Sequence, residues 1–410
     1  MQILYNILTY IVDFHLRLIA QFNHKIALGV KGRGLTFNKL NSQIGSTDKT
    51  IWFHCASLGE YEQGLPVFEA IKNDHPDHKI ILSFFSPSGY EVRKNCDLAD
   101  LVVYLPLDTK ANARRFLDLV HPELVIFVKY EIWPNYLSEI NKRDIKAVLI
   151  SALFRPDQSF FKPIGKWMRQ SLRAFDWIFV QDEQSETLLK EHGIDRVSIS
   201  GDTRFDRVGN QLKVNNAISF MDDFLNDSLC VVAGSTWPEG EKLLIEYINN
   251  DKTPTKYVIA PHNIKSHEIQ KLKASILPSV IQYSECEDSE LKEFKVLILD
   301  TIGLLSKVYS YASIAYVGGA IGTTGLHNTL EPAVFGVPIL IGSNYQKFPE
   351  AKNMIKNDGM FAVANQQELN DRLNQLINNA DFRLSSGNNN KRFIKKNQGA
   401  VVQIMDYLRK

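Results

Sequence analysis

The fold of this chain is decided by the stretch Ile314-Ala315-Tyr316-Val317-Gly318-Gly319-Ala320-Ile321-Gly322-Thr323-Thr324-Gly325-Leu326-His327-Asn328-Thr329-Leu330-Glu331-Pro332. Its first four residues form an apolar run that predicts a buried strand. A glycine-rich turn follows, and the rest predicts a helix that ends near Gly336. A strand that passes through such a turn into a helix creates a site where backbone amides can face a phosphate.

Three polar side chains in this stretch could contact a ligand, namely His327, Asn328 and Glu331. On a helix these positions project toward one side. That side would offer a donor, an amide and a carboxylate to a ribose or a phosphate. The alternative is a tight turn in which the histidine and the asparagine only cap the helix. The Glu331-Pro332 pair favours the nucleotide site.

Short apolar runs alternate with amphipathic stretches on both sides of a connection at 209–227, which has no strong strand pattern. This alternation predicts two parallel sheets covered by helices, an α/β fold of two Rossmann-like domains. Ligands of such sheets bind beyond the carboxyl ends of the strands, so we expect a cleft between two facing domains. The predicted strands are Ile51–Cys55, Ile80–Phe85, Leu101–Tyr104, Leu124–Val128, Lys146–Ile150, Trp177–Val180, Val197–Ser200, Leu229–Ala233, Tyr257–Ala260, Val280–Gln282, Lys295–Leu299, Ser313–Val317 and Pro338–Ile341.

Length and composition agree with this organisation. A chain of 410 residues is too long for one ordinary core. Lys and Arg together number 47 against 46 for Asp and Glu, which argues against electrostatic binding of nucleic acid by the whole chain. The cysteines are scattered, without metal or redox spacing, and predict reduced thiols in a cytosolic compartment. They are Cys55, Cys96, Cys230 and Cys286.

The N-terminal stretch 3–22 is rich in Ile, Leu, Tyr and Phe but is interrupted by Asp13, His15 and Arg17. A charge near the middle of a membrane span costs about 2.5–3.5 kcal/mol, so a confident span is not predicted. Apolar residues at helical spacing followed by basic residues are typical of a helix that lies in the membrane interface. A helix packed on the first domain is the alternative. No small-residue cleavage site is present, so a removed signal peptide is not expected.

Turns that follow predicted strands carry the candidate chemistry of the first half. Glu60, in Ser57-Leu58-Gly59-Glu60, is either a general base facing the cleft or a favourable partner of the helix dipole. Ser86 and Ser88 bind an acceptor or cap the next helix, and capping is favoured. Glu131 lines the cleft, or its loop marks a packed helix entry. Arg204 places a cation at the cleft, with a surface salt bridge as the alternative.

In the second half, Gly234-Ser235-Thr236 ends a predicted strand and offers hydroxyls and amides that fit a phosphate. No zinc site, P-loop or dinucleotide fingerprint is present in the sequence.

Eight motifs in order along the chain together resemble the bacterial 3-deoxy-D-manno-octulosonic acid (Kdo) transferases that act on lipid A precursors. That family consists of inverting glycosyltransferases of the two-domain GT-B type. The motifs are Ser57–Glu60, Ser86–Gly89, Leu105–Asp108, Glu131–Asn135, Gly201–Asp206, Gly234–Thr236, Asp300–Leu304 and Gly318–Pro332.

The resemblance implies transfer of Kdo from CMP-Kdo to a lipid A precursor, lipid IVA, in lipopolysaccharide core biosynthesis, with Glu60 as the catalytic base. It implies neither a cofactor nor a metal. The implied donor-binding residues are Arg204, Ser235, Thr236, His262, Gly318, Gly319, His327, Asn328 and Glu331. The implied acceptor-binding residues are Ser57, Gly59, Ser86, Ser88, Glu131 and Arg155.

The resemblance also implies a location at the cytoplasmic face of the bacterial inner membrane, because the N-terminal stretch matches the membrane-anchoring segment of the family. The expected organisation is a membrane-associated segment, an acceptor-binding domain, a linker, a CMP-sugar-binding domain and a terminal helix that packs back. Their ranges are 1–35, 36–210, 211–227, 228–387 and 388–410.

Some positions depart from the family pattern. His262 stands where the family has arginine, Arg204 where it usually has lysine, and Trp237 where histidine is common. Arg155 lies in a segment that often carries Asn-Ala-Arg in the family. Two alternatives remain: a GT-B enzyme that uses a UDP-sugar in another envelope glycolipid pathway, and a non-enzymatic membrane-associated module with a degenerate site.

Overall fold

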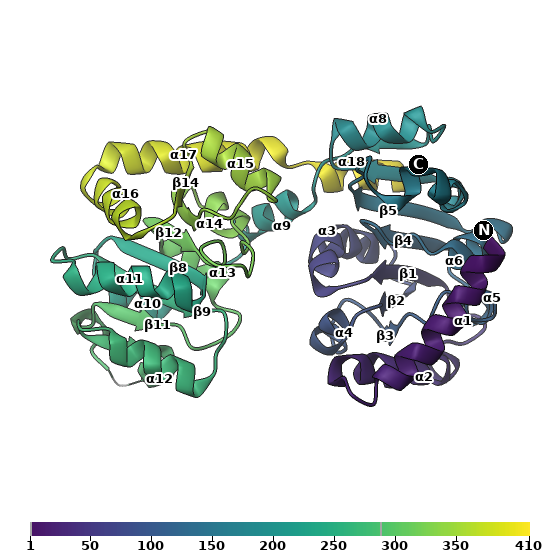
Figure 1. Ribbon diagram of the computed structural model, residues 1–410, viewed down its shortest axis with the longest axis horizontal. Coiled ribbons are helices and arrows are strands. Elements are labelled where there is room, and N and C mark those ends of the chain that lie inside the picture. Colours follow the sequence, from purple (N-terminus) through teal and green to yellow (C-terminus); the bar gives the residue numbers. More distant parts are fainter. Residues whose placement is uncertain (1, 288) are drawn as a thin grey trace. The chain divides into compact units, whose positions relative to one another are not determined.

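In the computed structural model, which describes residues 2–287 and 289–410, the chain forms two compact units. Unit 1 contains the chain up to Arg207 together with Gln398–Lys410, and unit 2 contains Val208–Asn397. Each unit is built on one parallel sheet with helices around it (Figure 1). The predicted α/β class with two parallel sheets is therefore confirmed.

The sheet of unit 1 has the strand order β3-β2-β1-β4-β5-β6-β7 among the described residues. All its neighbouring pairs are parallel. Most of its residues are buried, because helices cover both faces, and this explains the near-continuous apolar runs in the sequence. The strands are β1 (Thr50–Cys55), β2 (Lys79–Phe84), β3 (Leu101–Tyr104), β4 (Leu124–Val128), β5 (Lys146–Ala152), β6 (Trp177–Val180) and β7 (Val197–Ile199).

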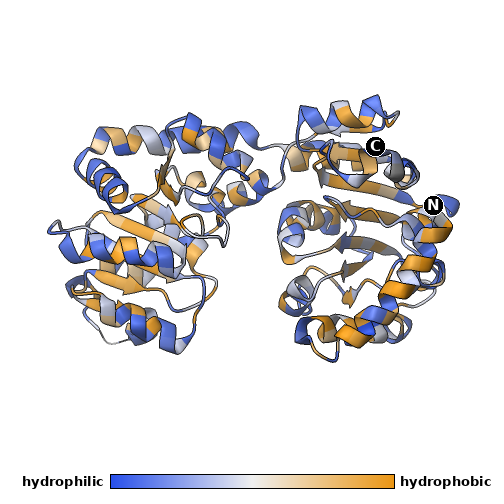
Figure 2. Cartoon of the chain, in the orientation of Figure 1, coloured by the Kyte–Doolittle hydropathy of each residue, from blue (hydrophilic) through white to orange (hydrophobic). Residues whose placement is uncertain are grey.

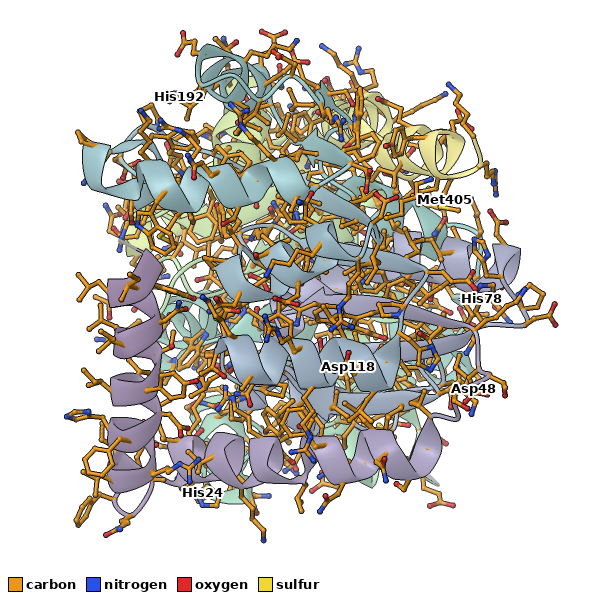
Figure 3. All side chains as sticks on the ribbon, turned by 90° about the vertical axis from the view of Figure 1, so that its right-hand side faces the viewer. His24, Asp48, His78, Asp118, His192 and Met405 are labelled. Atoms are coloured by element: carbon orange, nitrogen blue, oxygen red, sulfur yellow. The ribbon has the colours of Figure 1, made fainter. Side chains whose placement is uncertain are left out.

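Two apolar layers enclose this sheet. One contains side chains of α2, α5, α6 and α8, and the other contains side chains of α3, α4 and α18. The last of these helices brings the end of the chain back to unit 1, with Ile404 and Met405 in the core (Figure 3). The helices are α1 (Gln2–Ile19), α2 (His24–Gln43), α3 (Leu58–Asp74), α4 (Pro87–Arg93), α5 (Lys110–Val120), α6 (Pro134–Lys142), α7 (Lys166–Arg169), α8 (Glu183–Glu191) and α18 (Ala400–Leu408), with short 3-10 turns at η1 (Ser159–Phe161), η2 (Pro163–Gly165) and η3 (Gln170–Ala174).

The sheet of unit 2 has the order β10-β11-β9-β8-β12-β13-β14 in the described part of the chain. Its last strand was not predicted, and β8 continues beyond the predicted end at Ala233. The strands are β8 (Cys230–Thr236), β9 (Lys256–Pro261), β10 (Val280–Gln282), β11 (Val296–Ile298), β12 (Ile314–Val317), β13 (Ile339–Gly342) and β14 (Met360–Val363).

The helices of unit 2 complete the doubly wound pattern, and α11, α12 and α16 share a core with one face of the sheet. The connecting helix α9 (Arg204–Gln211) begins in unit 1 and ends in unit 2. The others are α10 (Ser219–Leu225), α11 (Pro238–Asn250), α12 (Ser266–Ser275), α13 (Leu305–Val308), α14 (Leu330–Val334), α15 (Pro349–Lys356), α16 (Gln366–Asn378) and α17 (Ala380–Asn397), with 3-10 turns at η4 (Tyr283–Glu285), η5 (Leu291–Glu293) and η6 (Tyr309–Tyr311).

Helix α1 lies along unit 1 and joins α2 near His24 (Figure 3). Its inner side is held by hydrogen bonds. The Tyr5 hydroxyl donates to Asp108 Oδ2 (2.6 Å), and the Asn135 side-chain amide donates to Asn6 Oδ1 (2.9 Å). Asp108 is 2 % exposed and also accepts from backbone amides at the start of α6. The helix is thus fixed to a buried carboxylate of the domain.

The other side of α1 carries large apolar side chains in contact with solvent. Ile3, Ile7, Tyr10 and Phe14, at helical spacing, are between 52 % and 77 % exposed. Phe22, in the turn before α2, is 90 % exposed. Figure 2 shows hydrophobic positions along the whole helix. Among the described residues, no helix is both long enough and apolar enough to cross a membrane.

Candidate active site

The polar residues of unit 1 gather at one edge of its sheet. The turns after β1, β2, β4 and β5 lie next to one another because these four strands are neighbours and parallel. The backbone is strained here. Lys129, directly after β4, has φ +64°, and Ser151, at an irregularity in β5, has φ +51°. Such conformations cost about 1–3 kcal/mol each and are concentrated at functional sites.

Glu60 lies in the first turn of α3, after β1, at this edge. Its carboxylate accepts a hydrogen bond from the Ala56 amide (2.5 Å), as a helix-capping acid would. Burial, and secondarily the charge of Glu131, raise the pKa of Glu60 to about 7. The Ala56 amide and Lys129 act in the opposite direction but do not prevail. The side chain therefore has a contact typical of a cap and the proton affinity of a general base.

Glu131, in the loop between β4 and α6, is 8 % exposed. Its Oε2 lies 2.9 Å from His54 Nε2 and accepts from the indole of Trp133 (2.8 Å). His54 Nδ1 in turn lies 2.9 Å from Ser83 Oγ. His54 and Ser83 are fully buried inside β1 and β2, and sequence reasoning missed them because they sit within otherwise apolar runs.

The other predicted acceptor residues occupy the same edge with different surroundings. Ser86 caps α4 by accepting from the Ser88 amide (3.3 Å), which is the capping role favoured by the sequence. Ser57 occupies the N-cap position of α3, yet its side chain makes no capping hydrogen bond. Gly59 is exposed, and a Cβ there would meet nothing within 4 Å. Arg155 is exposed, with a long contact to the Tyr130 hydroxyl (3.4 Å).

Arg204 begins α9 and forms an ion pair with Asp202 (2.7 Å). Asp202 is itself 7 % exposed and accepts a hydrogen bond from the side-chain amide of Gln63 (2.8 Å). The Arg204 guanidinium is therefore paired with a carboxylate that is itself hydrogen-bonded to Gln63 of α3. This pair matches the salt bridge proposed as the alternative for Arg204, whose guanidinium is partly exposed.

In unit 2 the glycine turn after β12 is shaped by backbone contacts. Gly318 donates to the carbonyl of Gly234 at the end of β8 (3.0 Å). A Cβ on Gly318 would lie 2.1 Å from the Ser235 carbonyl oxygen. Gly319 has φ +101°, and a Cβ there would lie 1.8 Å from the carbonyl oxygen of Gly325. Only glycine fits at these two positions, because backbone atoms cannot move aside as a flexible side chain can.

The backbone is also left-handed at a non-glycine residue near the end of β8. Ser235 has φ +49° at an irregularity in the pairing of β8 with β9, and Thr236 is buried and donates to Glu241 Oε1 (2.7 Å). A groove of about 970 Å³ between α11 and α12 begins beside Thr236, Trp237 and Pro261. The strand ends of unit 2 therefore border an open space that a ligand can enter.

Trp237, His262 and His327 form a stack of rings at the same end of unit 2. The Trp237 and His262 rings are 4.7 Å apart at 20°, and the two histidine rings are 4.5 Å apart. The Trp237 indole donates to His327 Nε2 (2.9 Å), so that nitrogen is an acceptor and the ring is neutral. Burial, with a smaller effect of His262, lowers the pKa of His327. The stack therefore brings together two of the predicted donor-binding residues, His262 and His327.

The predicted placement of His327 and Asn328 on a helix with Glu331 is wrong. Helix α14 begins only at Leu330, because Gly325 (φ +87°) turns the chain and Asn328 Oδ1 accepts from the Leu330 amide (3.1 Å). The contact between the side chains survives this change. The Asn328 amide donates to Glu331 Oε1 (2.9 Å), and Ser306 donates to Glu331 Oε2 (2.9 Å).

No group of three or more His, Cys, Asp or Glu residues that could hold a metal ion is found in the part of the chain that the structure describes. The four cysteines are free thiols, and Cys55 and Cys230 are buried.

The sequence is similar to known proteins of the family that the motifs resemble. Residues 31–207 match the family model of the 3-deoxy-D-manno-octulosonic-acid transferases (kdotransferases). A 3-deoxy-D-manno-octulosonic acid transferase from Aquifex aeolicus is 27 % identical over 333 residues, which cover 80 % of this chain and 86 % of that protein. One from Haemophilus influenzae is 26 % identical, covering 88 % of this chain and 86 % of its own.

A solved structure of UDP-GlcNAc 2-epimerase from Neisseria meningitidis, bound to UDP-GlcNAc, covers 88 % of this chain and 100 % of its own, with a TM-score of 0.62 and 16 % identity. That likeness concerns the fold alone and agrees with the two-sheet architecture expected of GT-B proteins. The resemblance inferred from the motifs is therefore confirmed, and the chain is a glycosyltransferase with a Kdo transferase domain at residues 31–207.

Proposed function

We propose that this protein transfers Kdo from CMP-Kdo to lipid IVA, a lipid A precursor, with inversion at the anomeric carbon of Kdo. The family match of residues 31–207 and the names of the relatives support the donor sugar and the reaction class. No metal ion or cofactor takes part in the proposed reaction.

The observation that carries the mechanism is the partly buried position of Glu60 in the first turn of α3, where burial and the charge of Glu131 raise its pKa to about 7. Near neutral pH a substantial fraction of the carboxylate is ionised and its conjugate acid is weak enough to favour proton uptake, which is the balance that a general base needs. As the acceptor hydroxyl attacks the anomeric carbon, its proton passes to Glu60. The new glycosidic bond forms while the bond to the phosphate oxygen of CMP breaks.

The strand ends of unit 2 hold the CMP moiety in this proposal. The glycine turn brings backbone amides to the end of β12, where amides can stabilise the negative charge that develops on the leaving phosphate. His327 is neutral, and its Nδ1–H remains available as a donor because Nε2 accepts from Trp237. The proposed donor residues are Arg204, Ser235, Thr236, His262, Gly318, Gly319, His327, Asn328 and Glu331.

On the acceptor side, the edge of unit 1 receives the sugar hydroxyl of lipid IVA close to Glu60. The proposed contacts are made by Ser57, Gly59, Ser86, Ser88, Glu131 and Arg155.

The exposed side of α1 supports a place for the protein on a membrane. Ile3, Ile7, Tyr10 and Phe14 present apolar surface to solvent on one side of a helix that is fixed to unit 1 on the other. An amphipathic helix of this kind binds at the boundary between headgroups and acyl chains. We propose that α1 lies on the cytoplasmic face of the inner membrane, where a lipid acceptor is available.

The test is incubation of the purified protein with CMP-Kdo and lipid IVA, followed by mass spectrometry of the lipid. An increase by one or more Kdo units is expected. Calorimetric titration with CMP and with UDP distinguishes the alternative donor. Tighter binding of UDP, together with an unmodified lipid, would replace the Kdo proposal by transfer from a UDP-sugar.

A further inference from the structure

Unit 1 contains a cavity of about 400 Å³ where α1 and α2 meet at an angle (Figure 3). One side of each helix lines it, together with the segment after β3 and the start of α5. The lining residues of α1 lie between Tyr10 and Arg17 and those of α2 between Val30 and Phe37, in both cases at helical spacing. A cavity of this volume is within the range in which proteins bind small ligands.

The walls of the cavity are largely apolar. Pro106 and Leu107, in the segment after β3, line it and are buried. Leu16, Val30 and Phe37 line it from the two helices and are only half-buried. Because these side chains keep apolar surface that a ligand can cover, the cavity favours a ligand that is itself mostly hydrocarbon.

The motif Leu105–Asp108 has no part in the proposed proton transfer, yet it holds the helices around this cavity. The carbonyl of Leu105 accepts from Arg33 Nε of α2 (3.2 Å). Asp108 accepts from the Tyr5 hydroxyl of α1 (2.6 Å). One short segment after β3 therefore fixes both helices and supplies the apolar wall between them.

Two cations border the cavity. Arg33 lines it and is half-buried, and the Arg115 guanidinium lies 4.3 Å over the Phe37 ring. Neither forms an ion pair with any residue that the structure describes, whereas Arg17 is paired with Asp13 (2.8 Å). A partly buried charge without a counter-ion favours an anion nearby. Apolar walls next to such cations suit an amphiphile, in which an acyl chain is joined to an anionic headgroup.

The cavity is separated from the proposed acceptor edge by one layer of side chains. The Arg33 guanidinium lies 4.4 Å over the Phe85 ring, and the Phe85 and Trp133 rings are 4.9 Å apart. The Trp133 indole donates to Glu131 (2.8 Å), and Ser86 follows Phe85 directly. A lipid whose sugar lies at this edge can therefore reach the cavity with one of its chains.

We propose that this cavity binds one acyl chain of the lipid acceptor. The inference rests on the proposed function for the identity of that lipid. Tyr10 lines the cavity and also belongs to the exposed apolar side of α1, so the two surfaces are continuous. A chain that leaves the membrane beside α1 enters the cavity along apolar surface, and its position there fixes the sugar of the same lipid relative to Glu60.

Gly34 offers a way to fill the cavity. It lies on α2 and lines the cavity, and a Cβ there would meet nothing within 4 Å. Gly34→Phe therefore places a ring in open space, and the replacement of a glycine inside a helix also favours the helix. Gly34→Ala brings the same gain for the helix but fills little of the cavity. The matched control is Asn38→Phe, which adds the same ring at an exposed position of α2 outside the cavity.

The first measurement compares two acceptors, a short-chain analogue of lipid IVA that stays monomeric in water and its deacylated counterpart. Gly34→Phe should raise the KM of the acylated acceptor, relative to that of the deacylated one, by about 10–50-fold, as expected if roughly two or three methylene groups are no longer buried. Its kcat should change little, because the chain is bound equally in the ground state and the transition state. Gly34→Ala should have a much smaller effect. Equal effects of Gly34→Phe and Asn38→Phe on the ratio of the two KM values would contradict the proposal.

The second measurement needs no sugar transfer. The short-chain analogue carries a diazirine at the end of one acyl chain and is irradiated with the full-length protein without CMP-Kdo, and mass spectrometry of peptides locates the label. Label is expected in the segments of α1, α2 and α5 that line the cavity, and Gly34→Phe should remove it. Label confined to the exposed side chains Ile3, Ile7 and Phe14, or located in unit 2, overturns the proposal.

If Gly34→Phe does not fold, Ala111→Phe fills the cavity from the start of α5 and should give the same results in both measurements. Absence of Kdo transfer by the wild type contradicts the proposed function, whereas the position of the label decides the role of the cavity on its own. The two failures are therefore distinguishable.

Discussion

The two units differ in the groups that lie at the carboxyl edge of the sheet. In unit 1 the edge is a set of titratable side chains, with Glu60 and Glu131 supported by buried polar residues from the strands. In unit 2 the edge is mostly backbone, with glycine at positions where a Cβ would meet carbonyl oxygens, and a stack of aromatic rings beside it. The first arrangement suits proton transfer, and the second suits recognition of an anion by amides.

In the proposed reaction, this difference would let one doubly wound fold serve both the acceptor half and the donor half of the transfer. The strands of both sheets end at an equivalent edge, and the turns after them determine what that edge does. If the division is correct, substitutions in unit 1 should affect the chemical step, and substitutions in unit 2 should affect binding of the nucleotide.

The sharpest test of the division is Glu60→Gln. Without the base, the rate of transfer should fall by about 10²–10⁴-fold. CMP affinity should not change, because the proposed nucleotide-binding residues lie mostly in unit 2. Product formation followed by mass spectrometry gives the rate, and calorimetry gives the affinity. Near-normal transfer by the folded variant would remove Glu60 from its role, and weakened CMP binding would argue against the division.

Gly319→Ala tests whether the glycine turn of unit 2 binds the nucleotide. The new methyl group would lie 1.8 Å from the Gly325 carbonyl oxygen, so the turn has to move. We expect CMP affinity to fall by about 10–100-fold, the equivalent of roughly 1.4–2.8 kcal/mol.

The matched control for that variant is Gly303→Ala, since Gly303 also has a left-handed backbone (φ +97°) but open space around it. It carries the same type of strain without the collision, and should lower stability by about 1 kcal/mol while leaving CMP affinity intact. Equal effects of the two substitutions on affinity would show that strain, not the shape of the turn, is responsible.

Stability should also reveal the raised pKa of Glu60. A carboxyl that binds its proton more tightly in the folded state stabilises the fold fully below its unfolded pKa of about 4.3, and this stabilisation is lost as the pH rises through about 7. Glu60→Gln should therefore raise the free energy of unfolding by about 3–4 kcal/mol at about pH 8 and change it little at about pH 4.

Denaturant unfolding at the two pH values measures that difference. An equal effect of Glu60→Gln on the free energy of unfolding at both pH values would contradict the raised pKa of Glu60.

The smallest effect is expected for Trp237→Phe, which keeps a ring in the stack but removes the donor to His327. A neutral hydrogen bond contributes about 0.5–1.5 kcal/mol, so CMP affinity should fall by about 2–13-fold. Nitrogen NMR of His327 should show that Nε2 is no longer restricted to accepting. Unchanged affinity together with an unchanged tautomer would mean that the indole only packs.

The architecture and the positions of the turns could be predicted because they depend on local patterns. Buried parallel strands are apolar without interruption, and turns at their carboxyl ends are polar or rich in glycine, so Glu60, Glu131 and the Gly318 turn were found. The short β14 was missed because Met360–Val363 resembles any apolar run next to a helix.

What could not be predicted depends on contacts between distant segments. His54 and Ser83 lie inside strands, and only the pairing of β1 with β2 and the return of the β4 loop bring them to Glu131. The left-handed Ser235 cannot be recognised from its residue type, which rarely adopts that conformation. Helix α14 starts only at Leu330, and the Asn328 side chain accepts from the Leu330 amide in the turn before it, an arrangement that the helical spacing of 327, 328 and 331 conceals.

The fixation of α1 to Asp108 has a practical consequence for preparing the protein. Exposed apolar helices at the start of a chain are commonly removed to improve solubility. Here such a truncation would also remove the Tyr5 donor from a carboxylate that is 2 % exposed and that holds the start of α6. Replacing Ile3, Ile7 and Phe14 by polar residues, with Tyr5 and Asn6 retained, is the better route to a form that stays dispersed without detergent.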